Sequence, residues 1–502
     1  MRLAVLIIIL LELLSFFGWA LPAFGNVAML VIVLLVAIVS IQNFRVGIAI
    51  TASELAIGSH GYLFAFVQEG LSISLRIGLF LVLCSVALVK AMRENKLMVW
   101  ASPYRWPLVA MALAVVLAIA RGAQTGNSFA NIFFDANAFL FFASALVLWQ
   151  GIKHIDDIRF VLSVAFAAVL ASTGKALFLL YMFSHKLWWA LPETYRWVRD
   201  TRIGELTQMT DSFFRIFFQS QIYAVMAFFI VLAFMAWFMH RDGWRASLRT
   251  RSWRMLALAL VALMANTLIS LSRSNWMGMV VAFCVLPLLV WRAGFPIMAW
   301  MRNSALTVIA SMVLGLILIA GIILVPFPPA GGSFSGSLFG SRALTFDNEA
   351  GVGSRWALLS PLWQAIAKQP IMGQGFGTEV TYTTQDPRLL AQNPTGEYTT
   401  FIFEWGYHDL WLKLGLFGLA SYAYLLFVLF RAGWLYLGHS RRGSEQVLVI
   451  GLLTGVVSLL VTHTTSPYIN HPLGISYLLF CAVFIDVLTR NKPIIDRSQG
   501  RS

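Results

Sequence analysis

Charged side chains are scarce in this sequence. They account for 12% of the 502 residues, whereas a soluble globular protein carries about 25%. Apolar residues make up 59% of the chain, and the mean hydropathy is +0.78. An ordinary water-facing surface cannot be assembled from this composition. The sequence therefore excludes a soluble protein and indicates one that crosses a membrane many times.

Cysteine is also rare. The three cysteines, Cys84, Cys284 and Cys481, all fall inside apolar runs, so neither a disulfide framework nor a thiolate metal site is predicted. No paired-histidine or clustered-carboxylate spacing points to another metal site. The apolar runs are continuous, which excludes a transmembrane barrel with its alternating pattern. We expect an all-α, polytopic transmembrane bundle without a metal or cofactor.

Runs of about 18 or more apolar residues recur along nearly the whole chain, and each can cross a membrane as a helix. The segment from Arg2 to Ala23 resembles a signal peptide, but a second run follows at once, which favours a retained helix. The range 46–67 is apolar but interrupted by charged and glycine residues, so a re-entrant, an interfacial and a spanning segment all remain open. About 12 to 14 spans are expected in total, and the side of the N-terminus depends on the number. The predicted spans lie near residues 3–20, 26–42, 71–89, 107–120, 133–149, 160–183, 213–239, 255–271, 275–291, 304–325, 410–430, 446–462 and 474–489.

The net charge of +14 indicates how the chain is oriented in the membrane and does not point to a nucleic-acid partner, because much of the basic excess lies in short loops between spans. Loops that carry clustered lysine and arginine belong in the cytoplasm. These clusters lie near residues 90–105, 241–254, 292–302, 431–442 and 490–501. The segments that then face outward are 184–212, 272–275, 326–409 and 463–473.

Four regions follow from this layout: a bundle over 1–325, a large periplasmic loop over 326–409, C-terminal membrane helices over 410–489 and a cytoplasmic tail over 490–502. The large loop is too short for an independent enzyme domain with a sizeable core. It begins with the run PFPPAGGSFSGSLFGS, which is typical of a flexible segment. Helical spacing resumes at Ser354 and stops at Pro370. We expect a partly helical lid over the outer mouth of the bundle.

Three arginines are predicted to face outward, where the positive-inside bias does not require them. They are Arg215, Arg273 and Arg355. A guanidinium stays charged at any relevant pH and binds phosphate in a two-pronged fork, so convergence of the three favours a pyrophosphate site. The alternative is that each arginine pairs with a local acid or with lipid phosphate.

His408 ends the loop just before a new span. An imidazole titrates near neutral pH and can accept a proton from a sugar hydroxyl. The neighbouring Glu404 and Asp409 are candidates to orient it. The alternative is an interfacial belt residue beside Trp and Tyr. Nearby, the run PIMGQGFGTE lacks the residues of a phosphate loop, so Gly375 and its neighbouring glycines predict a tight turn or a close backbone approach to a ligand.

These motifs resemble those of the O-antigen ligase and O-antigen polymerase superfamily, bacterial membrane glycosyltransferases with one long periplasmic loop. Arg215 before a phenylalanine pair is similar to the family's arginine ahead of a central span, and ISLSRS is similar to its Ser-Arg hairpin motif. SRWALLSPLWQAIAKQPIMGQGFG is similar to its Arg, amphipathic helix, Pro and glycine sequence. HDLWLKLGLFGL is similar to its histidine run, which places His408 at the functional histidine. The loop also carries an additional stretch, residues 383–400, outside this pattern.

The resemblance implies metal-independent, inverting glycosyl transfer at the periplasmic face of the bacterial inner membrane, with a polyprenyl-pyrophosphate-linked glycan as donor. It implies that Arg215, Arg273 and Arg355 hold the pyrophosphate and that His408 deprotonates the acceptor hydroxyl. The acceptor is lipid A core for a ligase and a growing glycan for a polymerase, and membrane lipids surround the protein. Both activities use the same donor chemistry, so these residues do not separate them.

Two other classes of protein stay open. Glu12 and Lys175 are ionisable residues near mid-span, and charges at that depth face a cavity or each other. A cavity would favour a transporter or a flippase for lipid-linked glycan. A structural scaffold for an envelope assembly would leave the outer arginines without a role.

Overall fold

The structure is a computed structural model, and it describes residues 2–68, 71–210, 212–326, 336–344, 350–384, 386–391, 393–439 and 443–491. Parts of two predictions lie outside the described residues. One is the basic cluster members Arg441, Arg442, Lys492, Arg497 and Arg501, and the other is the stretch 327–335 of the loop that we expect to be flexible.

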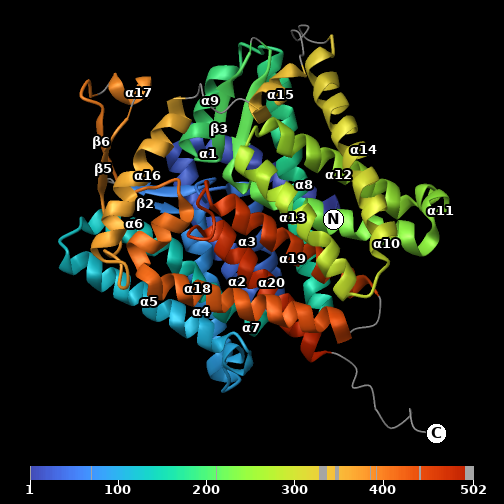
Figure 1. The fold of residues 1–502 in the computed structure, drawn as a ribbon, viewed down its shortest axis with the longest axis horizontal. Coiled ribbons are helices and arrows are strands. Elements are labelled where there is room, and N and C mark those ends of the chain that lie inside the picture. Colours follow the sequence, from blue (N-terminus) through green and yellow to red (C-terminus); the bar gives the residue numbers. More distant parts are fainter. Residues whose placement is uncertain are drawn as a thin grey trace.

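Apolar helices form the body of the molecule (Figure 1). Among the described residues, 13 segments are long and apolar enough to cross a membrane, and each overlaps one predicted span. The prediction of an all-α polytopic bundle is confirmed. These segments are α1 (Arg2–Ala20), α2 (Pro22–Gln42), α4 (Leu75–Arg93), α5 (Arg105–Gln124), α6 (Phe129–Phe139) continued through η2 (Leu140–Ala143) into α7 (Ser144–Gly151), α8 (Ile155–Ser184), α10 (Ile222–Asp242), α12 (Arg251–Ile269), α13 (Arg273–Arg292), α14 (Ile297–Leu324), α18 (Gly406–His439), α19 (Ser444–His463) and α20 (Pro472–Arg490).

The interrupted apolar segment folds as α3 (Phe44–Gly58), followed by a hairpin of β1 (Ala65–Gln68) and β2 (Leu71–Ser74). At one end of α3, Arg45 pairs with Asp157 at 3.5 Å, beside the loop between α7 and α8. At the other end, Ser59 hydrogen-bonds to Ser220 at 3.2 Å, just before α10. Since α10 starts at the opposite end of the bundle from Asp157, α3 runs through the bundle. Its 15 residues span about 22 Å, less than the roughly 30 Å of a hydrocarbon core, and most of them are buried among the neighbouring helices.

The charges inside this part of the bundle are paired. Arg76 of α4 donates to both carboxylate oxygens of Glu54 at 2.9 and 3.0 Å, and both side chains are buried. Lys175 of α8 donates to Glu12 of α1 at 2.6 Å. Removing one member of a buried pair typically costs about 3–5 kcal/mol. Glu12 and Lys175 therefore face each other, and the bundle tolerates both charges for that reason.

The two ends of the bundle differ in what they carry. The basic end holds the predicted cytoplasmic clusters, with η1 (Met98–Ala101) and α11 (Trp244–Arg249). The opposite end, called the loop end below, holds the remaining short elements, and Figure 1 shows α9, β3 and α15 gathered at its top and β5, β6 and α17 projecting at the upper left. These elements are α9 (Leu191–Asp200), β3 (Gly204–Gln208), β4 (Phe214–Phe218), η3 (Gln219–Gln221), α15 (Ser337–Leu344), α16 (Ala350–Lys368), β5 (Val380–Thr383), α17 (Pro387–Leu390) and β6 (Glu397–Thr400).

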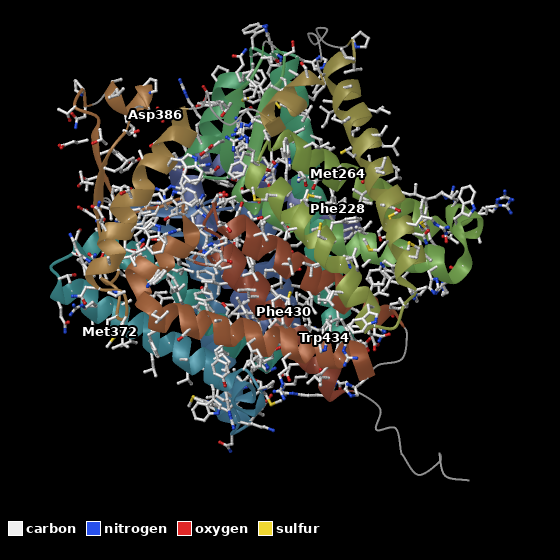
Figure 2. All side chains as sticks on the ribbon, in the orientation of Figure 1. Phe228, Met264, Met372, Asp386, Phe430 and Trp434 are labelled. Atoms are coloured by element: carbon white, nitrogen blue, oxygen red, sulfur yellow. The ribbon has the colours of Figure 1, made fainter. Side chains whose placement is uncertain are left out.

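Three small antiparallel hairpins, β1–β2, β3–β4 and β5–β6, depart from the all-helical expectation. The stretch 383–400 contains α17 and β6. Figure 2 shows Asp386, in the connection between β5 and α17, well away from the bundle centre. Phe228 and Met264, also labelled there, belong instead to an apolar core that includes residues of α8, α10 and α12. The hairpins thus lie at the loop end and do not contribute strands to the helical core.

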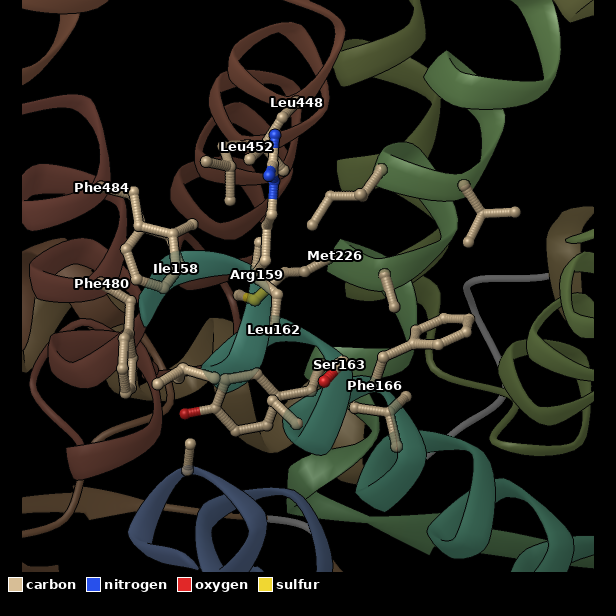
Figure 3. Close-up of a pocket in the computed structure, with 18 of the residues that line it drawn as sticks. Ile158, Arg159, Leu162, Ser163, Phe166, Met226, Leu448, Leu452, Phe480 and Phe484 are labelled. Atoms are coloured by element: carbon tan, nitrogen blue, oxygen red, sulfur yellow. The ribbon is translucent and has the colours of Figure 1, made fainter. Parts of the chain in front are cut away.

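A cavity of about 490 Å³ lies between α3, α8, α10, α19 and α20. Figure 3 shows side chains of α8, α19 and α20, among them Phe166, Leu452 and Phe480, around this space. The charged residues among its described lining are Arg159 and Glu445, next to the basic end. The cavity is suited to hydrocarbon, because the rest of its wall is mainly apolar.

Candidate active site

Arg215 lies on strand β4 rather than at the start of a membrane helix, so the prediction that it opens a span from residue 213 is wrong. α10 begins only at Ile222. The run FRIFF alternates, and Ile216 and Phe218 are fully buried, which leaves Arg215 on the opposite face of the strand. Its Nε donates to the carbonyl of Ser270 at 2.9 Å. This bond ties β4 to the turn between α12 and α13.

Arg273 is the first residue of α13, at the short hairpin that the sequence predicts. The turn is tight, with Leu271 at φ 47°, and the Ser272 hydroxyl caps α13 by accepting the N–H of Asn275. The Arg273 Nε donates to the carbonyl of Arg342 at 2.8 Å. Arg273 thereby joins α13 to α15 and lies beside an arginine that the sequence analysis did not single out.

Arg215, Arg273, Arg342 and Arg355 form a group of four guanidinium side chains, called the arginine cluster below. Desolvation and then the charges of the three others lower the pKa of Arg342 to about 10. Desolvation and the charges of Arg215 and Arg273 likewise lower the pKa of Arg355. The four groups are close enough to repel one another, so an anion bound among them would stabilise the arrangement.

The described acids that pair with the arginine cluster are Glu205 and Glu404. Glu205 lies 3.7 Å from Arg215 and is 71% exposed, which makes the pair weak in water. Glu404 directly contacts Arg355. The four guanidinium groups bring their charges close together. Positive charge that converges in this way is the arrangement that binds phosphate oxygens in proteins.

His408 lies in the first turn of α18, between two tryptophans. Its ring meets Trp363 of α16 and Trp405 edge to face, with ring centroids 5.1 and 5.9 Å apart. The Trp405 indole N–H donates to the carbonyl of Arg355 at 2.8 Å, so His408 and the arginine cluster are joined through Trp405 and α16. Within the described part of the chain, the His408 ring nitrogens make no hydrogen bond. They are therefore available to a substrate hydroxyl.

Glu404 and Asp409 do not contact His408 among the described residues. Glu404 pairs with Arg355, as stated above. Asp409 is buried, pairs with Lys413 at 2.7 Å and accepts from Asn470 at 2.5 Å. Lys413 also pairs with Asp135 of α6 at 2.9 Å. Both acids hold the chain on either side of His408 in place, which is a different task from orienting its ring.

The glycine run forms a tight turn directly after α16. Gly373, Gly375 and Gly377 have φ values of 73°, 90° and 76°, which favour glycine. A Cβ on Gly375 would lie 2.1 Å from the backbone nitrogen of Gly122 in α5. The close approach that these glycines allow is therefore to another helix of the protein, and it docks the end of α16 onto the bundle.

Substituting Gly375→Ala is expected to destabilise the protein by about 2–5 kcal/mol, because the new Cβ adds overpacking to left-handed backbone strain. Gly126→Ala is the matched control, since Gly126 has φ 76° but no atom within 4 Å of its Cβ position. The control should lose only the strain contribution of about 1–2 kcal/mol. Thermal inactivation in detergent measures both variants. Equal midpoints for the two would contradict the docking role.

The fold and this site define a multi-pass membrane protein with a cationic site beside a histidine at one end. Residues 256–423, about a third of the chain, match the family model described as O-antigen ligase. The match supports the O-antigen ligase and polymerase superfamily, and with it glycosyl transfer of the O-antigen ligase type in general. It includes Arg273, Arg342, Arg355 and His408, whereas Arg215 precedes it. Comparison with curated proteins and with solved structures gave no match.

Arg342 is the cluster member that the sequence analysis missed. It follows the Pro/Gly/Ser-rich stretch directly, in the run GSRALTF. Arg355 was selected because it is an arginine in the loop predicted to face outward, and the same is true of Arg342. The Pro/Gly/Ser-rich stretch before Arg342 suggested a flexible connection instead of a binding residue. Only the contact with Arg273 in the folded protein shows that Arg342 belongs to the arginine cluster.

Proposed function

We propose that the protein transfers a glycan from a polyprenyl-pyrophosphate carrier to an acceptor hydroxyl, as an O-antigen or surface-polysaccharide ligase or polymerase. The observation that carries this proposal is the convergence of four arginines at the loop end, joined through Trp405 to His408. In the proposal the loop end faces the periplasm, because the basic end has the charge bias of a cytoplasmic face. The membrane is the bacterial inner membrane, where such carriers present their glycans.

The chemistry follows from the residue types. The acceptor oxygen attacks the anomeric carbon while its proton passes to a nitrogen of His408. The bond between the anomeric carbon and the pyrophosphate oxygen breaks, and its electron pair leaves with the pyrophosphate. Arg215, Arg273, Arg342 and Arg355 stabilise the charge that develops there. A single displacement of this kind inverts the anomeric configuration, and none of these steps is assigned to a metal ion.

The transporter alternative receives little support from the described residues. Lys175 and Glu12, its best argument in the sequence, pair with each other. The cavity of about 490 Å³ is mainly apolar, whereas a path for a glycan needs polar walls. The cationic groups gather at the loop end instead of along a channel.

The proposal is tested by the envelope glycans of a deletion strain, compared with the same strain complemented by the wild-type protein. Long polymer trapped on the lipid carrier, with none on lipid A, is expected for a ligase. Single repeat units on the final acceptor, without long chains, are expected for a polymerase. Unchanged glycans on both carrier and acceptor would overturn the proposed function in this pathway.

A further inference from the structure

A second group of cationic and imidazole side chains lies at the loop end, outside the arginine cluster. His60 follows α3 and His471 precedes α20, and their rings meet edge to face with centroids 5.3 Å apart. The guanidinium of Arg202, which follows α9, lies 4.5 Å from the centre of the Tyr62 ring. Segments from three distant parts of the chain thus bring these groups together.

A buried arginine lies next to the two imidazoles. Arg76 is 2% exposed, and its Nη1 has no partner among the described residues, although Nε and the other terminal nitrogen bind Glu54. The turn at Gly61 rests directly on it, since a Cβ there would lie 3.1 Å from the Arg76 Nε. A buried N–H without a partner is unfavourable, and an acceptor atom bound beside it would remove that cost.

The electrostatics of this group favour an anion. Desolvation, then the charges of Arg76 and Arg202, lower the pKa of His60 to about 4. Burial, followed by His60 and Arg76, lowers the pKa of His471 well below its ordinary value. The two imidazoles can each present an N–H donor beside the guanidinium of Arg202 and the free Nη1 of Arg76. His60 and Arg202 also keep surface open to the outside.

The second group adjoins the arginine cluster without sharing a residue with it. The short helix η3 follows β4, the strand that carries Arg215. On the same segment, Ser220 bonds to Ser59, the neighbour of His60, at 3.2 Å. The Tyr468 hydroxyl, in the loop that carries His471, donates to the carbonyl of Gln219 at 3.2 Å. The segment from β4 to η3 therefore links the strand that carries Arg215 to the loops that carry His60 and His471.

We propose that His60, His471, Arg202 and Arg76 form a second anion-binding subsite, which takes a phosphate of the acceptor's head group. The inference rests on the proposed function, in which the arginine cluster takes the pyrophosphate of the donor. A transfer between two membrane-bound substrates needs both head groups held at the loop end. Two separate groups of N–H donors, side by side, provide one place for each.

The test uses Arg202→Gln and His471→Asn in the full-length protein. Arg202 is exposed, and Asn at 471 keeps the cap that the His471 Nδ1 provides by accepting the Leu473 N–H at 3.3 Å. With a phosphorylated acceptor, each variant is expected to raise the KM for acceptor about tenfold or more, because a charge-assisted or neutral hydrogen bond to phosphate is lost. The kcat and the KM for donor should not change. Arg196→Gln, which removes an exposed arginine of α9 paired with Glu193, is the matched control and should behave as the wild type.

Two further arms identify the anion. The same acceptor after phosphatase treatment should show no KM difference between variants and wild type, and a difference that persists would overturn the subsite. The assay is repeated in bilayers of zwitterionic and of anionic phospholipid. An effect that follows the bilayer charge instead of the acceptor phosphate would assign the group to a lipid head group and overturn the acceptor assignment.

Calorimetric titration of the solubilised protein with inorganic pyrophosphate separates this inference from the proposed function. The wild type is expected to bind at two sites, and a combined Arg202→Gln, His471→Asn variant at one. If the wild-type protein shows no glycan transfer, the proposed function is wrong. The titration then tests on its own whether the second anion-binding subsite exists. Binding of pyrophosphate at two sites in the combined variant would show that the proposed subsite is wrong.

Discussion

Replacing His408 by alanine is expected to lower glycan transfer by about 10²- to 10⁴-fold, the usual contribution of a general base. The loss should appear in kcat, because the proton moves only as the acceptor oxygen attacks. The fold should persist, since the half-buried ring contacts the edges of Trp363 and Trp405 and makes no hydrogen bond among the described residues. The substitution thus removes a reacting group and little packing.

Transfer by purified His408→Ala protein, with insertion checked separately, measures this effect. His439→Ala is the matched control, because His439 is exposed at the basic end and bonds only to the carbonyl of Leu435 among its described partners. Full transfer by correctly inserted His408→Ala protein would show that the base assignment is wrong. An equal loss in both variants would point to a general effect on the protein.

Replacing Arg342 by alanine is expected to lower transfer by about 10²- to 10³-fold, the usual cost of removing one donor that stabilises a developing oxyanion. Stability is expected to fall far less than activity. Desolvation and then the charges of Arg273, Arg215 and Arg355 lower the pKa of Arg342, so the charged side chain is held at a cost in the folded protein. The bond from Arg273 goes to the backbone carbonyl of residue 342 and survives the substitution. Loss of activity without a comparable loss of stability distinguishes a binding role from a structural one.

Arg342→Lys should recover only part of the activity, because an ammonium keeps the charge but not the planar fork of donors. Arg302→Ala, which removes an exposed arginine near the start of α14 at the basic end, is the control. Rates of transfer and thermal midpoints in detergent are measured for all three variants. A fall in midpoint that parallels the fall in rate would contradict the proposed role of Arg342.

The sequence predicted the membrane spans well, because each depends on local hydropathy over about 20 residues and not on its neighbours. It also selected Arg273, Arg355 and His408, since the charge bias of the loops reveals which polar residues face outward. It misplaced Arg215, because the strand FRIFF is apolar enough to extend the adjacent helical run. The pairing of β4 with β3, which makes the segment a strand, involves residues that carry no comparable hydrophobic signal.

The sequence suggested the wrong role for the two acidic residues beside His408. Glu404 and Asp409 flank His408 in the sequence, yet they pair with Arg355 and Lys413. Asp409 and Lys413 are four residues apart on α18, whereas Glu404 reaches an arginine of another helix, which only the fold brings close. The same holds for Asp135, which meets Lys413 across 278 positions of the chain.

By itself, the sequence determined that this chain is a bundle of apolar helices with a basic end and a loop end, because composition and charge bias act on each segment separately. Only the tertiary structure decided that α3 lies buried inside the bundle, where the pairing of Glu54 with Arg76 makes its charge tolerable. It also decided that Arg342 joins the arginine cluster and that His60 and His471 meet. These juxtapositions depend on how distant helices pack against one another.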